Sequence, residues 1–114
     1  TTMASILDYL SQSKSLGQTV TIEEPIEYMH TNPLITQREV GVTVNGFFEG
    51  VHEAMRQFPK NIVIGEIRHP DTAEAAVQAG LTGHRVFATL HAENIADVSL
   101  DKISDKNPIN YIII

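Results

Sequence analysis

The sequence predicts an α/β fold with a mainly parallel sheet and flanking helices. Three features support this prediction: apolar residues recur at helical spacing in three segments, short β-branched or apolar runs lie between those segments, and the two patterns alternate along the chain. Each helix in such an alternation returns the chain across the sheet, so that successive strands run parallel through right-handed crossovers.

The opening of the chain predicts a helix, which the serines and glycine of residues 11–17 end. Residues 19–22 are β-branched and typical of a strand. Pro25 stops that strand, because proline cannot donate to a sheet ladder. Residues 35–40 fit a further short strand that Gly41 breaks. The apolar residues of the opening helix share one face: Met3, Ile6, Leu7 and Leu10.

A second helix is predicted between Asn45, whose side chain can cap the free N–H groups of its first turn, and Pro59. Residues 61–64 are continuously apolar, which is typical of a strand buried on both faces, and Gly65 and Glu66 follow that strand directly. The apolar residues of this second helix share one face: Phe47, Val51, Ala54, Met55 and Phe58.

A third helix begins with a capping-box-like pair, Asp71 and Glu74, and Gly83 is typical of a helix end. Residues 85–90 predict a strand, with His91 at its end. Near the end of the sequence, residues 109–114 fit either an edge strand or an exposed apolar tail.

Composition excludes several classes of function. A formal net charge of -6 and a pI of about 5.2 argue against a dedicated nucleic-acid binder, but they do not exclude a nucleotide, whose phosphates backbone N–H groups can hold. No cysteine occurs among the 114 residues, which excludes disulfides and thiolate metal sites within them. No apolar run is long enough to span a bilayer.

Charged side chains gather where three of the predicted strands end. Because ligands of parallel sheets bind outside the carboxyl ends of the strands, this convergence predicts a functional site at that edge. The residues concerned are Glu23, Glu24, Glu27, Glu66 and His91.

Glu66 is the first candidate for catalysis, because an acid after an apolar strand can bind Mg²⁺ or orient an attacking water in phosphoryl transfer. Its alternative is an ion pair with Arg68. Glu23 and Glu27 lie so close in sequence that a cation such as Mg²⁺ would relieve their repulsion, and the alternative is a solvated acidic turn.

Histidines and arginines supply further candidates. His91 fits a phosphate sensor or an acid–base group, with a purely structural histidine as the alternative. His84 fits a cap at a helix end, where a partly positive ring is favoured. A zinc site from Glu66, His69, His84 and His91 lacks any established ligand spacing. Three arginines are candidates for phosphate or subunit contacts, and each has an ordinary surface ion pair as its alternative: Arg38, Arg56 and Arg68.

Several linked segments resemble the motor ATPases of type II secretion and type IV pili. Residues 21–28 are similar to the family's Asp box, and residues 62–68 to its atypical Walker B, in which Gly65 replaces the usual Asp before the catalytic Glu. The stretch after the Asp box and the two parts of the His box also match, at residues 37–41, 82–84 and 88–92.

The resemblance implies a RecA-like P-loop NTPase core that is truncated here: residues 1–97 form part of the core, and residues 98–114 are a divergent tail. The first residues resemble the helix that follows the family's Walker A loop, and no G-x-x-x-x-G-K-[ST] occurs among the 114 residues. The isolated chain is therefore expected to be inactive. Glu24 stands in place of the family's Asp, and His69 in place of an Asp that often follows Walker B.

The resemblance also implies roles. Glu66 would activate water, Glu23 and Glu27 would hold Mg²⁺ directly or through water, and His91 would read the γ-phosphate of ATP with support from His84. Arg56 and Arg68 would serve a subunit boundary. The parent protein would be a cytoplasmic homohexamer at the inner membrane that drives a platform protein and does not bind nucleic acid. The alternative is a non-catalytic interaction module or a decayed remnant of such an ATPase.

Overall fold

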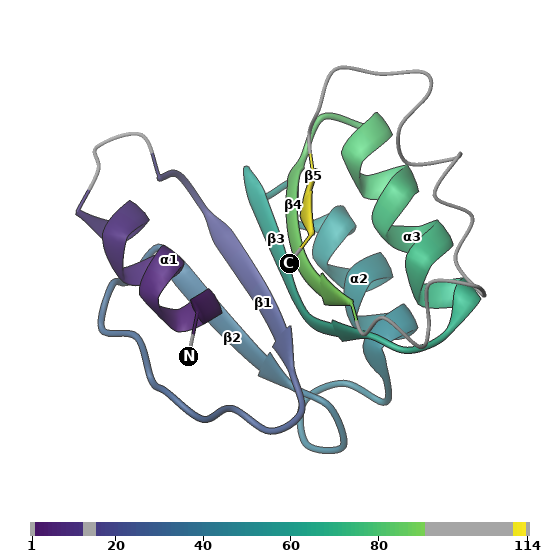
Figure 1. The fold of residues 1–114 in the computed structure, drawn as a ribbon, viewed down its shortest axis with the longest axis horizontal. Helices are drawn as coiled ribbons and strands as arrows, with labels where there is room; N and C mark the ends of the chain where they lie inside the picture. The colour runs from purple at the N-terminus through teal and green to yellow at the C-terminus, as the bar shows by residue number, and fades with distance from the viewer. Residues whose placement is uncertain (1, 13–15, 91–110, 114) are drawn as a thin grey trace.

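The computed structural model describes residues 2–12, 16–90 and 111–113, which form a sheet with helices on both of its faces (Figure 1). The sheet's strands all run parallel, in the order β2-β1-β3-β4-β5. This confirms the predicted α/β fold. The elements in chain order are α1 (Thr2–Ser11), β1 (Thr19–Glu23), β2 (Ile35–Glu39), α2 (Phe47–Arg56), β3 (Asn61–Ile67), α3 (Pro70–Leu81), β4 (Arg85–Leu90) and β5 (Tyr111–Ile113).

The sequence fitted residues 109–114 to either an edge strand or an exposed apolar tail. Residues 111–113 pair with residues 86–88 of β4 in parallel, so they form an edge strand of the sheet. The opposite edge is β2, which pairs only with β1 among the described strands. Within the same described part of the chain, no helix has the length and hydropathy needed to cross a membrane.

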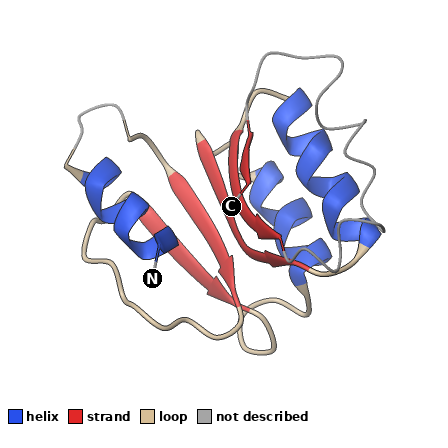
Figure 2. Ribbon diagram, viewed as in Figure 1, coloured by secondary structure: helices blue, strands red, loops and turns tan. Residues whose placement is uncertain are grey.

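Helices cover both faces of the sheet, α1 on one side and α2 with α3 on the other (Figure 2). Alternate residues of β3 divide between the two faces: Ile62 and Ile64 pack with α2 and α3, and Val63 packs with Leu7 of α1. This alternation is the period of two that a pleated strand imposes. Because both faces are covered, residues 62–64 of β3 form a continuous, buried apolar run, as predicted.

The start and end of α2 differ from the prediction. Gly46, not Asn45, is the N-cap residue of α2, and no side chain caps the first turn. Phe58 lies beyond the helix, with a φ of 52° and 84% of its surface exposed, so it is not part of the buried face. The rest of the predicted face is confirmed, since Val51 and Ala54 are buried in the core.

The start of α3 also differs. The helix begins at Pro70, a favoured first position because proline's missing N–H is not needed there. Asp71 therefore lies inside the first turn, where its Oδ1 accepts the N–H of Thr72, and the predicted capping box with Glu74 is wrong. The predicted end is confirmed: Gly83 follows the helix with a φ of 102°, a conformation that favours glycine.

Gly50 allows α2 to approach the sheet closely. A Cβ at this position would lie 2.9 Å from Cγ2 and 3.0 Å from Cγ1 of Ile22, which is fully buried at the centre of the sheet. Such a contact is too short for real Cβ atoms. Glycine therefore determines how near α2 lies to β1, the strand that carries Glu23.

The amino-terminal edge of the sheet is held by a buried polar cluster. Nδ2 of Asn61 donates to the carbonyl of Leu16 at 2.6 Å and to Oγ1 of Thr19 at 3.0 Å. Its Oδ1 accepts from Nε of Arg85 at 2.9 Å. Asn61 is fully buried, so these bonds replace the water that its amide loses. They link β3 to β1 and β4 at their first residues.

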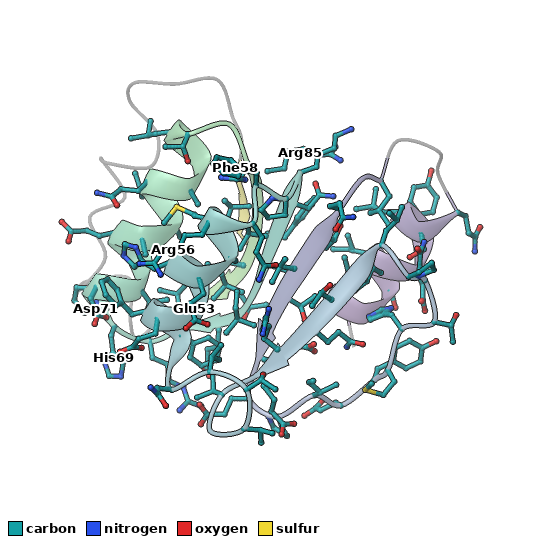
Figure 3. All side chains as sticks on the ribbon, turned by 180° about the vertical axis from the view of Figure 1, so that it is seen from behind. Glu53, Arg56, Phe58, His69, Asp71 and Arg85 are labelled. Atoms are coloured by element: carbon teal, nitrogen blue, oxygen red, sulfur yellow. The ribbon has the colours of Figure 1, made fainter. Side chains whose placement is uncertain are left out.

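We predict that Gly50→Ala destabilises the protein. Alanine favours a helix over glycine by up to about 1 kcal/mol, but the clash with Ile22 outweighs that gain, and overpacking of this kind costs about 1–3 kcal/mol. Thermal unfolding of the variant should begin at a lower temperature than that of the parent. Glu53→Ala, on the exposed face of the same helix, is the control and should change little (Figure 3). Equal melting temperatures for Gly50→Ala and the parent would contradict this packing.

Asn61→Leu should also destabilise the protein, because a side chain of similar size removes the amide and leaves the carbonyl of Leu16 and Nε of Arg85 without that partner. Each buried group left unpaired costs about 1–3 kcal/mol. Urea unfolding should give a clearly lower midpoint than for Gln57→Leu, the same kind of change at an exposed position. A midpoint equal to that of Gln57→Leu would show that the cluster does not stabilise the fold.

Candidate functional site

The carboxyl ends of the described strands meet at one edge of the sheet, and that edge carries most of the predicted site. Glu23 ends β1 beside Glu39, which ends β2, and the two residues are partners in the strand register. Glu66 is the next-to-last residue of β3, and β4 ends at Leu90. His91 lies outside the described residues.

Gly65 brings β3 unusually close to β1 at this edge. A Cβ on Gly65 would lie 3.2 Å from the carbonyl oxygen of Ile22 and 3.5 Å from Cα of Glu23. On its other side, Oγ1 of Thr89 in β4 donates to the carbonyl of Gly65. The backbone directly before Glu66 is therefore held from both neighbouring strands.

The register of β3 shifts just where Glu66 occurs. Pairing with β4 is regular from Asn61 to Ile64 and resumes with Ile67 opposite Leu90. Ile64 and Ile67 both pack in the core under α2 and α3, although strict alternation would put residues three apart on opposite faces. Because of the irregularity, Ile67 packs in the core. The side chain of Glu66, which lies within the irregularity, no longer follows the regular alternation of β3 residues between the two faces.

The carboxylate of Glu66 pairs with Arg68. Nε of Arg68 lies 2.5 Å from Oε2 of Glu66, with side-chain exposures of 56% and 18% respectively. The ion-pair alternative from the sequence is thus present. A half-exposed pair of this kind stabilises the fold by no more than about 1 kcal/mol, so its main effect is to orient the carboxylate.

Glu23 accepts two hydrogen bonds through one oxygen. Oγ1 of Thr21, which is fully buried, donates to Oε2 of Glu23 at 2.7 Å, and Nε2 of Gln37 donates to the same oxygen at 3.1 Å. Oε1 of Glu23 accepts no hydrogen bond from the described residues. The carboxylate is therefore oriented by its neighbours on one side and available to a ligand on the other.

The segment that follows β1 carries the other predicted acids. Glu24 and Glu27 are both exposed. The N–H of Ile26, between them, donates to Oε1 of Glu39 at 2.9 Å, which attaches this segment to the end of β2. Glu24 and Glu27 thus lie on a segment anchored at the carboxyl edge and open to solvent.

These acids fit a magnesium ion bound together with a nucleotide better than a metal held by protein alone. Among the described residues, no group of three or more His, Cys, Asp or Glu side chains could hold a metal ion. Mg²⁺ commonly takes one or two carboxylates and completes its shell with water and phosphate oxygens. Glu23, with one oxygen available, matches that donor set, and Glu27 is accessible as a second ligand.

His84 does not join this edge. It precedes β4, so it lies at the amino-terminal edge, where its ring is buried and Nδ1 contacts the carbonyl oxygen of Pro59 at 2.6 Å. His84 and Glu66 therefore lie at opposite ends of the strands, and they cannot bind the same zinc ion. This rules out a zinc site that combines His84 with Glu66 and His69. His84 also does not cap α3 with its side chain, since the ring bonds to Pro59 instead.

The arginines are spread over the molecule. Arg56 is the last residue of α2 and its side chain is exposed (Figure 3). The helix begins near the carboxyl edge after β2 and ends before β3 starts, so Arg56 lies at its far end from that edge. Arg38 is half-buried in β2. Of the three candidates, only Arg68 is brought to Glu66.

Three residues that organise the edge have no role predicted from the sequence: Gln37, Glu39 and Thr89. Their signal was available in part, because Gln37 and Glu39 alternate along a predicted strand and so share one face. The strand register with β1, which puts them beside Thr21 and Glu23, could not be read from the sequence.

Comparison with known proteins supports a single family. The family described as "Type II/IV secretion system protein" matches residues 1–103. The type IV pilus retraction ATPase PilT of Pseudomonas aeruginosa is 41% identical over 110 residues, which is 95% of this chain and 31% of PilT. The type II secretion system protein E of Pectobacterium carotovorum is 40% identical over 106 residues, 92% of this chain and 20% of that protein.

Solved structures agree. A crystal structure of the pilus retraction motor PilT with bound ADP matches with a TM-score of 0.75 and 44% identity, over 81% of this chain and 27% of that one. The ATPase DotB of Legionella pneumophila matches with a TM-score of 0.75 and 35% identity, over 84% of this chain and 28% of DotB.

The chain spans less than a third of the length of these relatives. Within that span the family match extends over nearly all of the sequence, and the fold matches part of the PilT and DotB structures. The chain therefore belongs to the type II/IV secretion system protein family, as a partial chain related to the type IV pilus ATPases.

Proposed function

We propose that this chain is part of the ATP-hydrolysing core of a motor that powers type IV pilus extension or retraction, or type II protein secretion. One observation carries the proposal: Glu23 and the Glu66 segment meet at the carboxyl edge of a parallel sheet, where the backbone of β1 and β3 approaches through Gly65. Ligands of such sheets bind at that edge. The proposed ligands are ATP and Mg²⁺, consistent with the ADP in the related PilT structure.

Glu66 would orient and activate the attacking water. Phosphoryl transfer depends on positioning and on charge stabilisation, so the carboxylate must be held in one orientation. Gly65 and Thr89 hold its backbone, and Arg68 holds its carboxylate in the absence of a nucleotide.

Glu23 and Glu27 would hold Mg²⁺, directly or through its waters, and Mg²⁺ would neutralise charge on the phosphates. Thr21 and Gln37 orient the carboxylate of Glu23 for this role. His91 would read the γ-phosphate. For His84 we propose only an indirect role, because its ring is bonded to Pro59 at the other edge.

Arg56 and Arg68 are proposed for the boundary between subunits of a homohexamer, a role that the exposure of both side chains permits. In this proposal the motor works in the cytoplasm against a platform protein of the inner membrane. Residues 1–97 would form the ATPase part of the chain, and residues 98–114 a divergent tail that includes β5.

A non-catalytic interaction module is the second candidate. It is favoured by one observation: the 114 residues contain no G-x-x-x-x-G-K-[ST] sequence to hold the β- and γ-phosphates. In the ATPase Glu66 activates the attacking water, whereas in the interaction module it has no catalytic role. Variants of Glu66 in the full-length product of the gene that encodes these residues therefore distinguish the two candidates.

In that full-length protein, we expect Glu66→Gln to lower kcat for ATP hydrolysis by about 100-fold or more, since loss of a general base typically costs 10²–10⁴-fold. Nucleotide binding should be retained, because the amide preserves the shape of the side chain. Steady-state ATPase assays and binding of a fluorescent ATP analogue would measure both. Glu53→Gln, the same change on the exposed face of α2, is the matched control. Equal turnover by Glu66→Gln and Glu53→Gln would contradict the assigned role.

The 114-residue chain alone should hydrolyse ATP at least about 100-fold more slowly than the full-length protein, because it has no phosphate-binding loop to position the substrate. Turnover per molecule of the purified chain and of the full-length protein would be compared under the same conditions. Fast turnover by the short chain that disappears in Glu66→Gln would show that these residues suffice, against our expectation.

A further inference from the structure

Gln37 uses its side-chain amide in three hydrogen bonds at the carboxyl edge. Nε2 donates to Oε2 of Glu23 at 3.1 Å and to the carbonyl of Tyr28 at 2.8 Å. Oε1 accepts the N–H of His30 at 2.9 Å. One residue of β2 thereby contacts both the end of β1 and the segment that follows it.

The chemistry of the partners determines which way this amide faces. A carboxylate oxygen and a peptide carbonyl can only accept, whereas a peptide N–H can only donate. Turning the amide over would oppose oxygen to oxygen twice and N–H to N–H once. The orientation of Gln37 is therefore specified by Glu23, Tyr28 and His30 together.

Gln37 and Glu39 together hold the backbone of the segment that follows β1. Within the described residues, the backbone of residues 24–30 bonds to the rest of the protein only through the side chains of Gln37 and Glu39. Both side chains project from the same face of the edge strand β2, in register with Thr21 and Glu23. Glu39 binds the N–H of Ile26, and Gln37 holds the next turn of the chain.

We propose that Gln37 is a positioning residue for the magnesium site. It holds the Glu23 carboxylate through Oε2, so that Oε1 remains for the cation or its waters, and through Tyr28 and His30 it sets the path of the segment that carries Glu27. This inference rests on the proposed function, because it assigns how the cation's ligands are oriented. A group that orients a metal ligand in this way commonly changes metal affinity or activity by roughly 10- to 100-fold when it is removed.

The test is Gln37→Met in the full-length product of the gene, with Gln78→Met as the matched control. Methionine preserves the length of the side chain and removes all three hydrogen bonds, and Gln78 is exposed on α3, away from the carboxyl edge contacts. We expect the Mg²⁺ concentration at half-maximal ATPase rate to rise about tenfold or more in Gln37→Met, and to stay unchanged in Gln78→Met.

A double-mutant cycle separates positioning from general stability. In a Glu23→Gln background, Gln37→Met should raise the Mg²⁺ requirement by a smaller factor than in the parent, because the carboxylate that Gln37 orients is gone and only its effect through the segment that carries Glu27 remains. A merely structural role would lower the melting temperature and leave the Mg²⁺ requirement unchanged in both backgrounds, and that result would overturn the inference.

The outcomes also separate this inference from the proposed function. If the parent hydrolyses ATP and Glu66→Gln does not, while Gln37→Met has the Mg²⁺ requirement of Gln78→Met, only the role of Gln37 is wrong. If the full-length parent has no ATPase activity, the proposed function fails and the role of Gln37 fails with it.

Discussion

The pairing of β1 with β3 is the constraint on which the site depends. These strands are about forty residues apart in sequence, yet they lie in register from Thr19 opposite Asn61 to Ile22 opposite Ile64. The two strands remain close at Gly65. A side chain at this position would lie too near the carbonyl oxygen of Ile22, so glycine allows the contact. Glu23 and Glu66 come to the same edge only through this contact. β2 then joins β1 at the outer side and supplies the polar side chains that orient Glu23.

The amino-terminal and carboxyl edges of the sheet differ in the kind of hydrogen bonds that they contain. At the amino-terminal edge, the buried side chains of Asn61 and His84 each form a hydrogen bond with a backbone carbonyl, which replaces the water that their polar atoms lose. At the carboxyl edge, Glu23 and Glu66 keep part of their surface exposed, and their hydrogen bonds orient them. The fully buried amide of Asn61 thus lies at the amino-terminal edge, and the partly exposed acids that we propose for ligand binding lie at the carboxyl edge, where ligands of α/β folds bind.

Much of this arrangement could be predicted from the sequence. Continuous apolar runs and helical periodicity predicted β1, β3, β4 and the three helices, and parallel alternation predicted that Glu23 and Glu66 share an edge. Local details were harder, because Asn45 and Asp71 carry cap-like side chains that the observed helix starts do not use. Strand order and register depend on contacts between distant residues. For that reason only the structure shows the hydrogen bonds that Gln37 forms with Glu23, Tyr28 and His30, and only the structure separates His84 from Glu66.

The position of the metal ion tests most directly whether Glu23 and Glu66 form a nucleotide site at the carboxyl edge. A crystal structure of the full-length protein with ADP and Mn²⁺ would locate the ion by its anomalous signal, since Mn²⁺ can replace Mg²⁺ among oxygen ligands. We expect the signal at the carboxyl edge, within about 5 Å of the Glu23 carboxylate, a span that allows one bridging water. A signal beside His84 and Pro59 at the amino-terminal edge, or nucleotide bound with no metal near Glu23, would contradict it.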